Sequence, residues 1–420
     1  MSPKPLKAVA TLAAVCLLAA ACGSSSSSEG SSSSSGGSSS TTKAATGSLI
    51  MVGQILPLTG ANLALPEVGN SLAASITALN NTGGINGHPM KLIQCDTQGV
   101  ASVEVQCAQQ MVSDHVVATL ADNTFSAEAQ VQGIFNAAGI PRIGIEKADP
   151  SEYQSHVNFD FTGGGIFILV AMMDALIHKG DKKLSVLVPD SPQAAETHLL
   201  LDPIAHNQGA KVVNYVLVSS ASGDYSQYVA QAQENGAQGM ALALPNAQLF
   251  QVAQSIDQLS PKIDFTTGIA GLSLNQLKQL GQFSTKASYV WWTPGVDDVR
   301  NFPGLAQPVA QLTTYMKNAN VNNLTAQSLT SWLAVHAFYE VMKARPGTPT
   351  AASVLAAFKE AKDVPMNGLI SPWTPTDYQS AGSFSSIFQN VSNPWAYRVV
   401  YNGTGTQTST SQMFNTFAGL

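Results

Sequence analysis

The chain has 420 residues, of which 45% are apolar and only 11% are charged, and its formal net charge is −6. This composition is typical of a large globular protein with a well-buried interior. The excess of acidic residues argues against nucleic acid as a partner, because binding to phosphates requires a concentration of basic side chains.

The first 21 residues are typical of an export signal. Lys4 and Lys7 precede an apolar run at 8–21, which ends in small residues directly before Cys22. The run is too short to span a bilayer, which takes about 20 residues. Small residues followed by cysteine resemble the bacterial lipoprotein signal, which implies lipidation of Cys22 and its exposure as the new N-terminus. A plain secretory signal or an uncleaved anchor is the alternative, and Cys16 is disfavoured because a bulky residue precedes it.

Residues 22–47 consist largely of Ser and Gly. Such a segment cannot bury apolar surface, so we expect a disordered tether. The folded body should begin at Ser48, and its length of about 370 residues is enough for two domains.

The first part of the body alternates strands and helices. Runs of apolar and β-branched residues predict strands, and apolar residues at helical spacing predict the helices between them. The strands are expected at 49–56, 90–95, 116–121 and 140–145, and the helices at 68–79, at 102–111 with Ser102 as N-cap, and at 131–138. This alternation predicts a parallel sheet with helices on both faces.

Cys95 and Cys107 are the two cysteines of the expected body. Cys95 should end a strand, and Cys107 should face it from the next helix. Outside the cytoplasm, a pair this close in sequence indicates a disulfide. Two buried free thiols are the alternative, and a metal site would need more ligands.

The alternation restarts in the second part. The apolar segment 166–177 carries Asp174 and is interpreted as a buried helix. Strands are expected at 184–188, 211–218, 240–244, 263–267 and 288–292, with helices through 206 and at 225–234 and 247–259; a further helix is expected at 325–343, and short strands and loops from 370. Two similar α/β sheets in one exported chain indicate two lobes around a cleft.

Ligands of open α/β sheets bind beyond the carboxyl ends of the strands, and this rule selects the candidate loops. The candidate ligand-binding residues are Thr59, Asn123, Thr124, Phe125, Ser126, Asp190, Ser191, Asn246, Ala270 and Trp292. The loop 123–126 is the strongest candidate, because its hydroxyls and free helix N-terminal amides suit a carboxylate or another acceptor. Alternatively, Ser126 only caps the next helix and Phe125 packs in the core.

Several other features are interpreted more conservatively. Trp291 and Trp292 should point to opposite faces, so that one is core and the other, by preference Trp292, stacks on the ligand. Glu146 and Lys147 are expected to pair at the rim of the site rather than to bind ligand. The segment 162–165 is taken as a hinge, because a phosphate loop would need a Gly-Lys-Ser/Thr ending. Asp297 and Asp298 are expected in a solvated loop.

The motifs that end the first strand and follow the first helix resemble those of a known family. They are the segment 55–60, ILPLTG, the segment 80–87, NNTGGING, and Asp96 after the second strand. The chain resembles the type I periplasmic binding proteins, in the leucine/isoleucine/valine-binding branch, over residues 48–420. The resemblance implies two Rossmann-like lobes joined by three hinge segments, with lobe I at 48–162 and 294–371 and lobe II at 163–293 and 372–420.

The family implies capture of a small organic solute, an amino acid or a related compound, for an ABC importer. Family members that bind amino acids place a carboxylate after a later strand of lobe II, where this chain reads GIAG at 268–271. Because 268–271 contains no acid, we expect a less polar or uncharged ligand in place of a branched-chain amino acid. Asp190 is the one acid in a matching loop, and it comes from another loop.

We find no catalytic set and no metal-binding spacing, and we expect neither enzyme activity nor a cofactor. The expected partners are the small-molecule ligand, an ABC permease and, through the lipid on Cys22, the outer side of the cytoplasmic membrane. The chain should be a monomer. A sensory receptor subunit without a transporter, or less plausibly an exported hydrolase, is the alternative.

Overall fold

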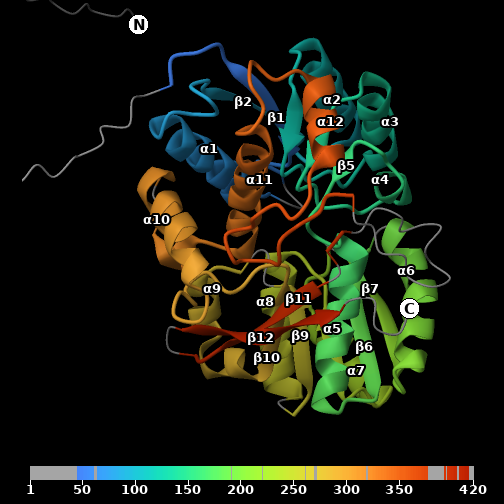
Figure 1. The fold of residues 1–420 in the computed structure, drawn as a ribbon. Coiled ribbons are helices and arrows are strands. Elements are labelled where there is room, and N and C mark those ends of the chain that lie inside the picture. Colours follow the sequence, from blue (N-terminus) through green and yellow to red (C-terminus); the bar gives the residue numbers. More distant parts are fainter. Residues whose placement is uncertain are drawn as a thin grey trace, which may run out of the picture. The chain divides into compact units, whose positions relative to one another are not determined.

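The computed structural model describes residues 45–60, 64–190, 192–219, 221–260, 262–268, 272–317, 320–376, 392–393, 395–403 and 406–415. The predicted signal peptide, the tether up to residue 44 and Cys22 lie outside these residues, as do Ser191 and Ala270. The described chain forms two separate β-sheets with helices packed around them (Figure 1).

The first sheet has five parallel strands in the order β2-β1-β3-β4-β5. Its strands are β1 (Ile50–Leu56), β2 (Met90–Asp96), β3 (Ala118–Leu120), β4 (Arg142–Ile143) and β5 (Asn158–Phe159), with helices α1 (Pro66–Asn81), α2 (Ala101–Ser113), α3 (Glu128–Ala138) and α4 (Pro150–Tyr153). The predicted alternation is confirmed. Strands β3 and β4 are shorter than predicted, because only two or three residues of each pair with a neighbour.

The start of α2 differs from the prediction. The helix begins at Ala101, its N-cap residue is Val100, and no side chain caps it. Ser102 is therefore already inside the first turn, and its assignment as N-cap is wrong. The main-chain carbonyl of Val100 accepts instead from the amides of Val103 and Glu104.

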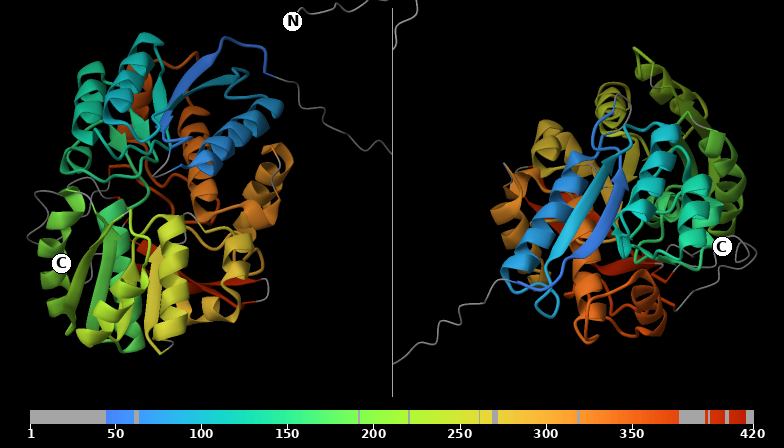
Figure 2. Two further views of the ribbon diagram at one scale, coloured as in Figure 1. Left: turned by 180° about the vertical axis from the view of Figure 1, so that it is seen from behind. Right: turned by 90° about the horizontal axis from the view of Figure 1, so that it is seen from above.

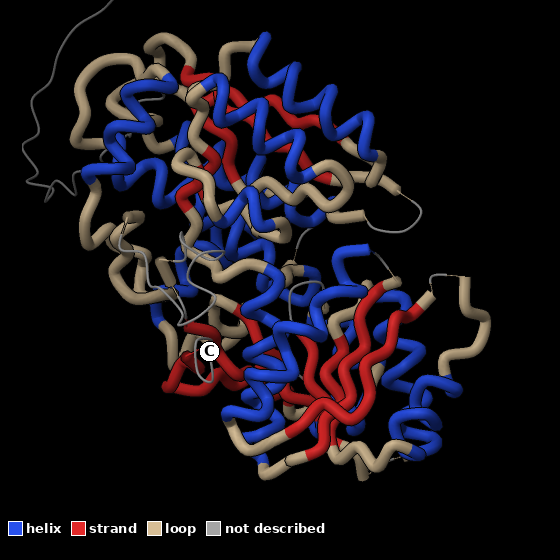
Figure 3. Tube along the Cα trace, turned by 90° about the vertical axis from the view of Figure 1, so that its right-hand side faces the viewer, coloured by secondary structure: helices blue, strands red, loops and turns tan. Residues whose placement is uncertain are grey.

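The second sheet has seven strands in the order β12-β11-β10-β9-β8-β6-β7. Strands β6 (Lys183–Pro189), β7 (Lys211–Val218), β8 (Gly239–Leu242), β9 (Asp264–Gly268) and β10 (Ala287–Trp291) are parallel, whereas β11 (Trp395–Tyr401) and β12 (Gln407–Asn415) are antiparallel. The helices here are α5 (Gly165–Lys179), α6 (Pro192–Asn207), α7 (Ser226–Glu234), α8 (Asn246–Leu259), α9 (Leu274–Gln279) and the 3₁₀ helix η1 (Gly281–Lys286). Helices flank the strands of this sheet (Figure 3).

Helix α5 is buried along most of its length, as predicted from its apolar sequence. It packs against β8, β9 and β10 of the second sheet. Burial on several sides explains why its sequence shows little amphipathic contrast. Among the described residues, no helix combines the length and the apolar character that crossing a membrane requires.

The chain passes between the two sheets more than once. It leaves the first sheet after β5 and enters the second through α5. After β10 it returns through η2 (Pro303–Leu305), α10 (Ala306–Tyr315), η3 (Val321–Asn323), α11 (Ala326–Met342) and α12 (Ala351–Glu360). Helices α10 and α11 pack on α1, and α11 lies alongside α1 in the views of Figure 2. The chain then rejoins the second sheet as β11 and β12.

The segment after β10 is attached to the edge strand β12. Asp298 is 4% exposed and accepts a hydrogen bond from the amide of Ser409 at 2.6 Å. Asp297 accepts from the amide of Gln407 at 3.2 Å. The expected solvated loop is therefore wrong, because both carboxylates bind the main chain of a neighbouring strand.

Candidate functional site

The carboxyl ends of both sheets reach the first turns of α11. On the side of the first sheet, Glu146 follows β4, and its Oε2 accepts a hydrogen bond of 3.1 Å from Nε2 of Gln327 on α11. From the second sheet, Nε1 of Trp291, the last residue of β10, donates to Oγ1 of Thr330 at 3.3 Å. Gln327 and Thr330 are three residues apart and share one face of the helix. The two strand ends therefore meet at α11, and ligands of open α/β sheets bind beyond the carboxyl ends of the strands.

Four buried polar atoms near this junction have no hydrogen-bond partner in the described structure. They are Oδ1 of Asn123, Oε1 of Gln327, Nε1 of Trp292 and Oγ1 of Thr293. A buried polar group without a partner costs about 1–3 kcal/mol, so such groups are uncommon in folded proteins. Their occurrence at the strand ends is what a site for a polar solute would produce.

Three amides at the end of the loop after β3 are not free. The carboxylate of Glu104 accepts from the amides of Phe125, Ser126 and Ala127 at 3.0, 3.1 and 2.8 Å. Ser126 donates its hydroxyl to the carbonyl of Gly99 at 3.1 Å, and the N-cap of α3 is Ala127 without a side-chain bond. The prediction of free amides is therefore wrong for residues 125–127, and the alternative in which Ser126 caps the next helix is wrong as well.

Glu104 was not singled out from the sequence, although one signal was available. It lies three residues before Cys107 on the apolar stripe of α2, and it is completely buried. An acid on such a stripe needs partners of its own. The amides across the helix interface supply them.

Thr124 belongs to a buried ionic network. Its hydroxyl donates to Oε1 of Glu152 at 3.1 Å and accepts from Nη2 of Arg142 at 3.3 Å. Arg142 also forms ion pairs with Asp122 at 3.0 Å and with Glu152 at 3.2 Å. Burial raises the pKa of Glu152, and the charge of Arg142 opposes that shift. The hydroxyl of Thr124 therefore has two partners within the protein.

Asn123 and Phe125 have different surroundings from Thr124. The amide of Asn123 donates to the carbonyl of Ile55 at 2.9 Å, which places it beside the end of β1. Its Nδ2 donates to Ala121, so that only Oδ1 remains unpaired. Phe125 is half-buried against the small apolar cluster of Leu56, Leu65 and Val68.

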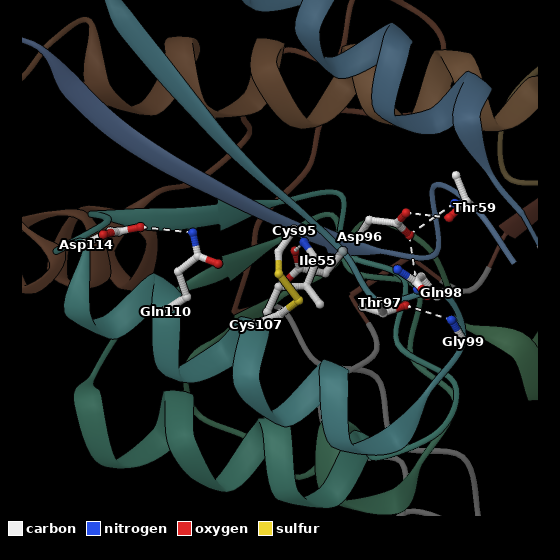
Figure 4. Close-up of a disulfide and its surroundings, with 11 residues drawn as sticks. Ile55, Thr59, Cys95, Asp96, Thr97, Gln98, Gly99, Cys107, Gln110 and Asp114 are labelled. Carbon is white, nitrogen blue, oxygen red and sulfur yellow. Dashed lines mark hydrogen bonds between the residues drawn. A yellow bond between two sulfur atoms is a disulfide. The ribbon is translucent and has the colours of Figure 1, made fainter. Parts of the chain in front are cut away.

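Thr59 lies in the loop after β1 and is fixed by Asp96 (Figure 4). Its amide and hydroxyl donate to the carboxylate at 3.1 and 2.5 Å, and the amide of Gln98 donates at 3.0 Å. Burial alone would raise the pKa of Asp96, but these hydrogen bonds hold it below its ordinary value. Directly before Asp96, Cys95 forms the predicted disulfide with Cys107, with a Cα–Cα distance of 5.6 Å, so this prediction is confirmed.

Lys147 does not lie at a rim, so that part of the prediction is wrong. Its ammonium pairs with Asp160 at 3.1 Å, and both side chains are completely buried. Burial lowers the pKa of Lys147, while Asp160 opposes the shift. The carbonyl of Lys147 accepts from the amide of Gly165, which places the pair beside the passage between the sheets.

Glu146 is half-buried and belongs to the junction itself. Burial raises its pKa to about 7, the bond from Gln327 opposes this, and the nearby charge of Asp160 adds to it. Near neutral pH this carboxyl group is therefore present in both protonation states. From the sequence, pairing at the rim was preferred to contact with the ligand for this residue.

Fewer contacts define the candidate residues of the second sheet. Asp190 is exposed at the end of β6, and its amide donates to Val218 at 3.1 Å. Asn246 is the first residue of α8. Trp292 is 1% exposed and packs beside Gly163. Trp291 is 2% exposed. Neither tryptophan is therefore open to solvent, and Trp292 retains an unpaired indole N–H.

A cavity of about 440 Å³ lies elsewhere, among α1, α10 and α11. It is lined by side chains such as Trp332 and His336, not by the ends of the strands. Within the described part of the chain, His, Cys, Asp and Glu side chains form no group of three or more suited to a metal ion.

The chain belongs to the periplasmic binding protein family, because the model of that family matches residues 50–385. It is therefore a solute-binding protein of the ABC-transporter type that acts outside the cytoplasm, and it is not an enzyme, as the sequence indicated. A comparison with curated protein sequences finds no match.

Solved structures with the same fold share little sequence with this chain. An extracellular ligand-binding receptor from Verminephrobacter eiseniae is 16% identical, with a TM-score of 0.72 over 86% of this chain and 99% of that one. An R. palustris solute-binding protein in complex with 4-hydroxybenzoate is 15% identical, with a TM-score of 0.70 over 87% and 97%. The Streptococcus pneumoniae protein LivJ, in complex with isoleucine, is 12% identical, with a TM-score of 0.66 over 86% and 99%. At these identities they establish the fold alone.

Proposed function

We propose that this protein captures one small organic solute at the junction of its two sheets and delivers it to an ABC permease. The observation that carries the proposal is the meeting of β4 and β10 on α11, beside four buried polar atoms without partners. In binding proteins of this kind, a ligand shifts the equilibrium between open and closed forms, and a membrane partner recognises the closed form.

The solute is proposed to be something other than a branched-chain amino acid. Its ammonium group would need a carboxylate or several acceptors if it were buried. The segment 268–271 contains no acid, and the sequence offers Asp190 from another loop. A less polar or uncharged solute next to Trp292 would need fewer such partners. That isoleucine and 4-hydroxybenzoate occupy proteins of this fold indicates how widely its ligands range.

The lobes are proposed to comprise residues 48–162 with 294–371, and 163–293 with 372–420. Residue 162 lies between β5, which belongs to the first sheet, and β6, which belongs to the second. This supports the first boundary. The protein is further proposed to be a monomer. It is proposed to be held at the membrane by a lipid on Cys22, and the sequence of the first 47 residues supports this attachment.

A thermal-shift screen over amino acids, amides, aromatic acids and polyols tests the central proposal. We expect one class to raise the melting temperature, and calorimetry on its best member to give a single site. Asn123→Ala and Gln327→Ala should each weaken that binding about tenfold, while the exposed Glu234→Ala should leave it unchanged. Equal affinity in all variants would remove the junction from the site.

A further inference from the structure

Two glutamates of the chain occupy five backbone amides that could otherwise hold an anion. Glu104 accepts from the amides of residues 125, 126 and 127 in the loop after β3. In the loop after β4, Oε2 of Glu152 accepts from the amides of Ala148 and Asp149 at 2.8 and 3.2 Å. Both glutamate side chains are completely buried. Amides clustered in this way favour a carboxylate, and here that carboxylate is internal.

The cations closest to these loops are also paired. Arg142 pairs with Asp122 and Glu152, and Lys147 pairs with Asp160. Both basic side chains are completely buried. A ligand carboxylate at the described strand ends of the first sheet would therefore lose its hydration without compensation from these two cations or from the five amides.

Of the four unpaired atoms at the junction, the two on the side of the first sheet are acceptors. Oδ1 of Asn123 and Oε1 of Gln327 are buried without a partner. The carboxyl group of Glu146 lies next to Gln327 and receives one hydrogen bond from it. Acceptors without donors are satisfied by a ligand that brings hydroxyl, amide or amine hydrogens.

We propose that the first-sheet wall of the site selects a ligand that donates hydrogen bonds and excludes a ligand carboxylate, with Glu104 as the residue that enforces the exclusion. The inference rests on the proposed function and specifies its substrate class. Asn123, Gln327 and Glu146 contact the ligand, whereas Glu104 acts through the amides that it occupies.

The experiment removes the internal carboxylate and supplies a small one in solution. Glu104→Ala should have a lower melting temperature than the wild type, because three amides lose their acceptor. Sodium formate should restore part of that loss, beyond the effect of sodium chloride at equal ionic strength. The wild type and the matched control Glu234→Ala, which alters an exposed acid at the end of α7, should respond equally to the two salts.

A ligand screen of the wild type provides the second arm. Neutral polyols, amides and amines should include the binding class, and monocarboxylic acids should produce no shift. If the ligand is an amine, its binding should strengthen as Glu146 ionises, and Glu146→Gln should abolish it. Binding that a Glu146→Gln variant leaves largely unchanged identifies a neutral ligand.

The outcomes separate this inference from the proposed function. A carboxylic acid that binds the wild type and loses at least tenfold in Asn123→Ala overturns the inference and supports the function. No formate-specific rescue of Glu104→Ala also overturns the inference. If no solute binds, the proposed function fails, and the formate arm still decides whether the amides form an internal anion site. If Glu104→Ala does not fold in chloride, refolding in formate replaces the melting measurement, and recovery there supports the inference.

Discussion

Three buried or half-buried carboxyl groups have a pKa of about 7 in the folded protein. Burial is the main cause for Glu128, Glu146 and Asp174, and partial burial raises the pKa of Asp297 to about 6. In the unfolded chain such groups ionise near pH 4. Between pH 4 and 7 the folded state therefore holds more protons, and its stability falls as pH rises. We expect these groups to make the melting temperature higher at pH 5 than at pH 8.

Asp174 gives the clearest single-residue test of this effect. It is 1% exposed within α5, and Gln208 donates to its Oδ1 at 2.6 Å. Asp174→Asn keeps an acceptor for Gln208 and removes the charge that is costly to bury. The variant should be more stable than the wild type at pH 8, on the order of 1–3 kcal/mol, with the difference shrinking toward pH 4.

Urea unfolding at pH 5 and pH 8 measures this difference. Asp202→Asn serves as the control, because Asp202 is exposed on α6 and its replacement should change little at either pH. The variant's gain in stability over the wild type should be larger at pH 8 than at pH 5. A smaller gain at pH 8 would contradict the assignment.

Side-chain partners were the part of the site that the sequence could not supply. The loop 123–126 was selected correctly as a strand-end loop, but its amides bind Glu104, which comes from another helix. Likewise, Lys147 was expected at a rim and instead pairs with Asp160 in the interior. Such pairs depend on packing between elements, and no local pattern specifies them.

At the scale of elements, the glycines of the passage between the sheets have different constraints. Gly164 has a φ of +78°, and a Cβ there would lie 2.3 Å from Oη of Tyr153 and 2.6 Å from the carbonyl of Lys147. Gly165 is the first residue of α5, and its Cβ would approach only the Lys147 carbonyl, at 3.7 Å. The two neighbours therefore form a matched pair for substitution.

Gly164→Ala should destabilise the protein by about 1–3 kcal/mol from backbone strain alone, with the clash in addition. Gly165→Ala should be close to neutral. Thermal unfolding of both variants, with calorimetry on an identified ligand, measures the effect on stability and on binding. Equal melting temperatures for the two variants would show that residue 164 does not need its left-handed conformation.

The disulfide connects β2 to α2. Cys107 lies one turn after Glu104, so the bond also helps to hold the helix that carries the buried glutamate. Replacing both cysteines by serine should cost about 3 kcal/mol, the chain-entropy estimate for a loop closed over a separation of 12 residues. Denaturant unfolding measures the cost, and the wild type with dithiothreitol should behave like the double variant. Two freely alkylated thiols in native protein from the host would show that the bond does not form in the cell.

Elements with a long apolar period were predicted well, whereas the short strands and the start of one helix were not. Strand β7 at Lys211–Val218 and the helices α8 and α11 agree with prediction within about a residue. Strands β3 and β4 pair with their neighbours over only two or three residues, far fewer than their apolar runs suggest. The start of α2 was wrong, since the main chain of Val100 replaces a side-chain cap.

For the whole molecule, the passages between the sheets are linked to one another. Asn393, just before β11, donates to the carbonyl of Phe161 at 2.9 Å, and Ser392 donates to that of Asp160 at 2.6 Å. The first and last passages therefore share hydrogen bonds beside the buried pair of Lys147 and Asp160. The motifs of the first strand and helix were sufficient to predict this fold, because they lie in the scaffold. The ligand depends on loops that differ among proteins of one fold.

Cys22→Ala tests the proposed attachment to the membrane. The variant should lose incorporation of labelled fatty acid and should move from the membrane fraction to the soluble extracytoplasmic fraction, because the lipid is the proposed anchor. Binding of an identified ligand should remain unchanged, since the body begins at Ser48 in the prediction. A variant that stays in the membrane fraction and keeps its label would refute the assignment of Cys22.

The branched-chain amino acids provide the decisive test of ligand class for the protein as a whole. A zwitterion must place its carboxylate and its ammonium group at once, and burial of either without partners is costly. At the described loops of the first sheet, Glu104 and Glu152 already occupy five amides, and 268–271 lacks an acid. Calorimetric titration with leucine, isoleucine and valine should therefore give no measurable heat of binding at micromolar protein. A micromolar dissociation constant for any of them, on the order of −8 kcal/mol, would overturn this expectation. Asp190→Asn and Glu146→Gln would then show which acid holds the ammonium group.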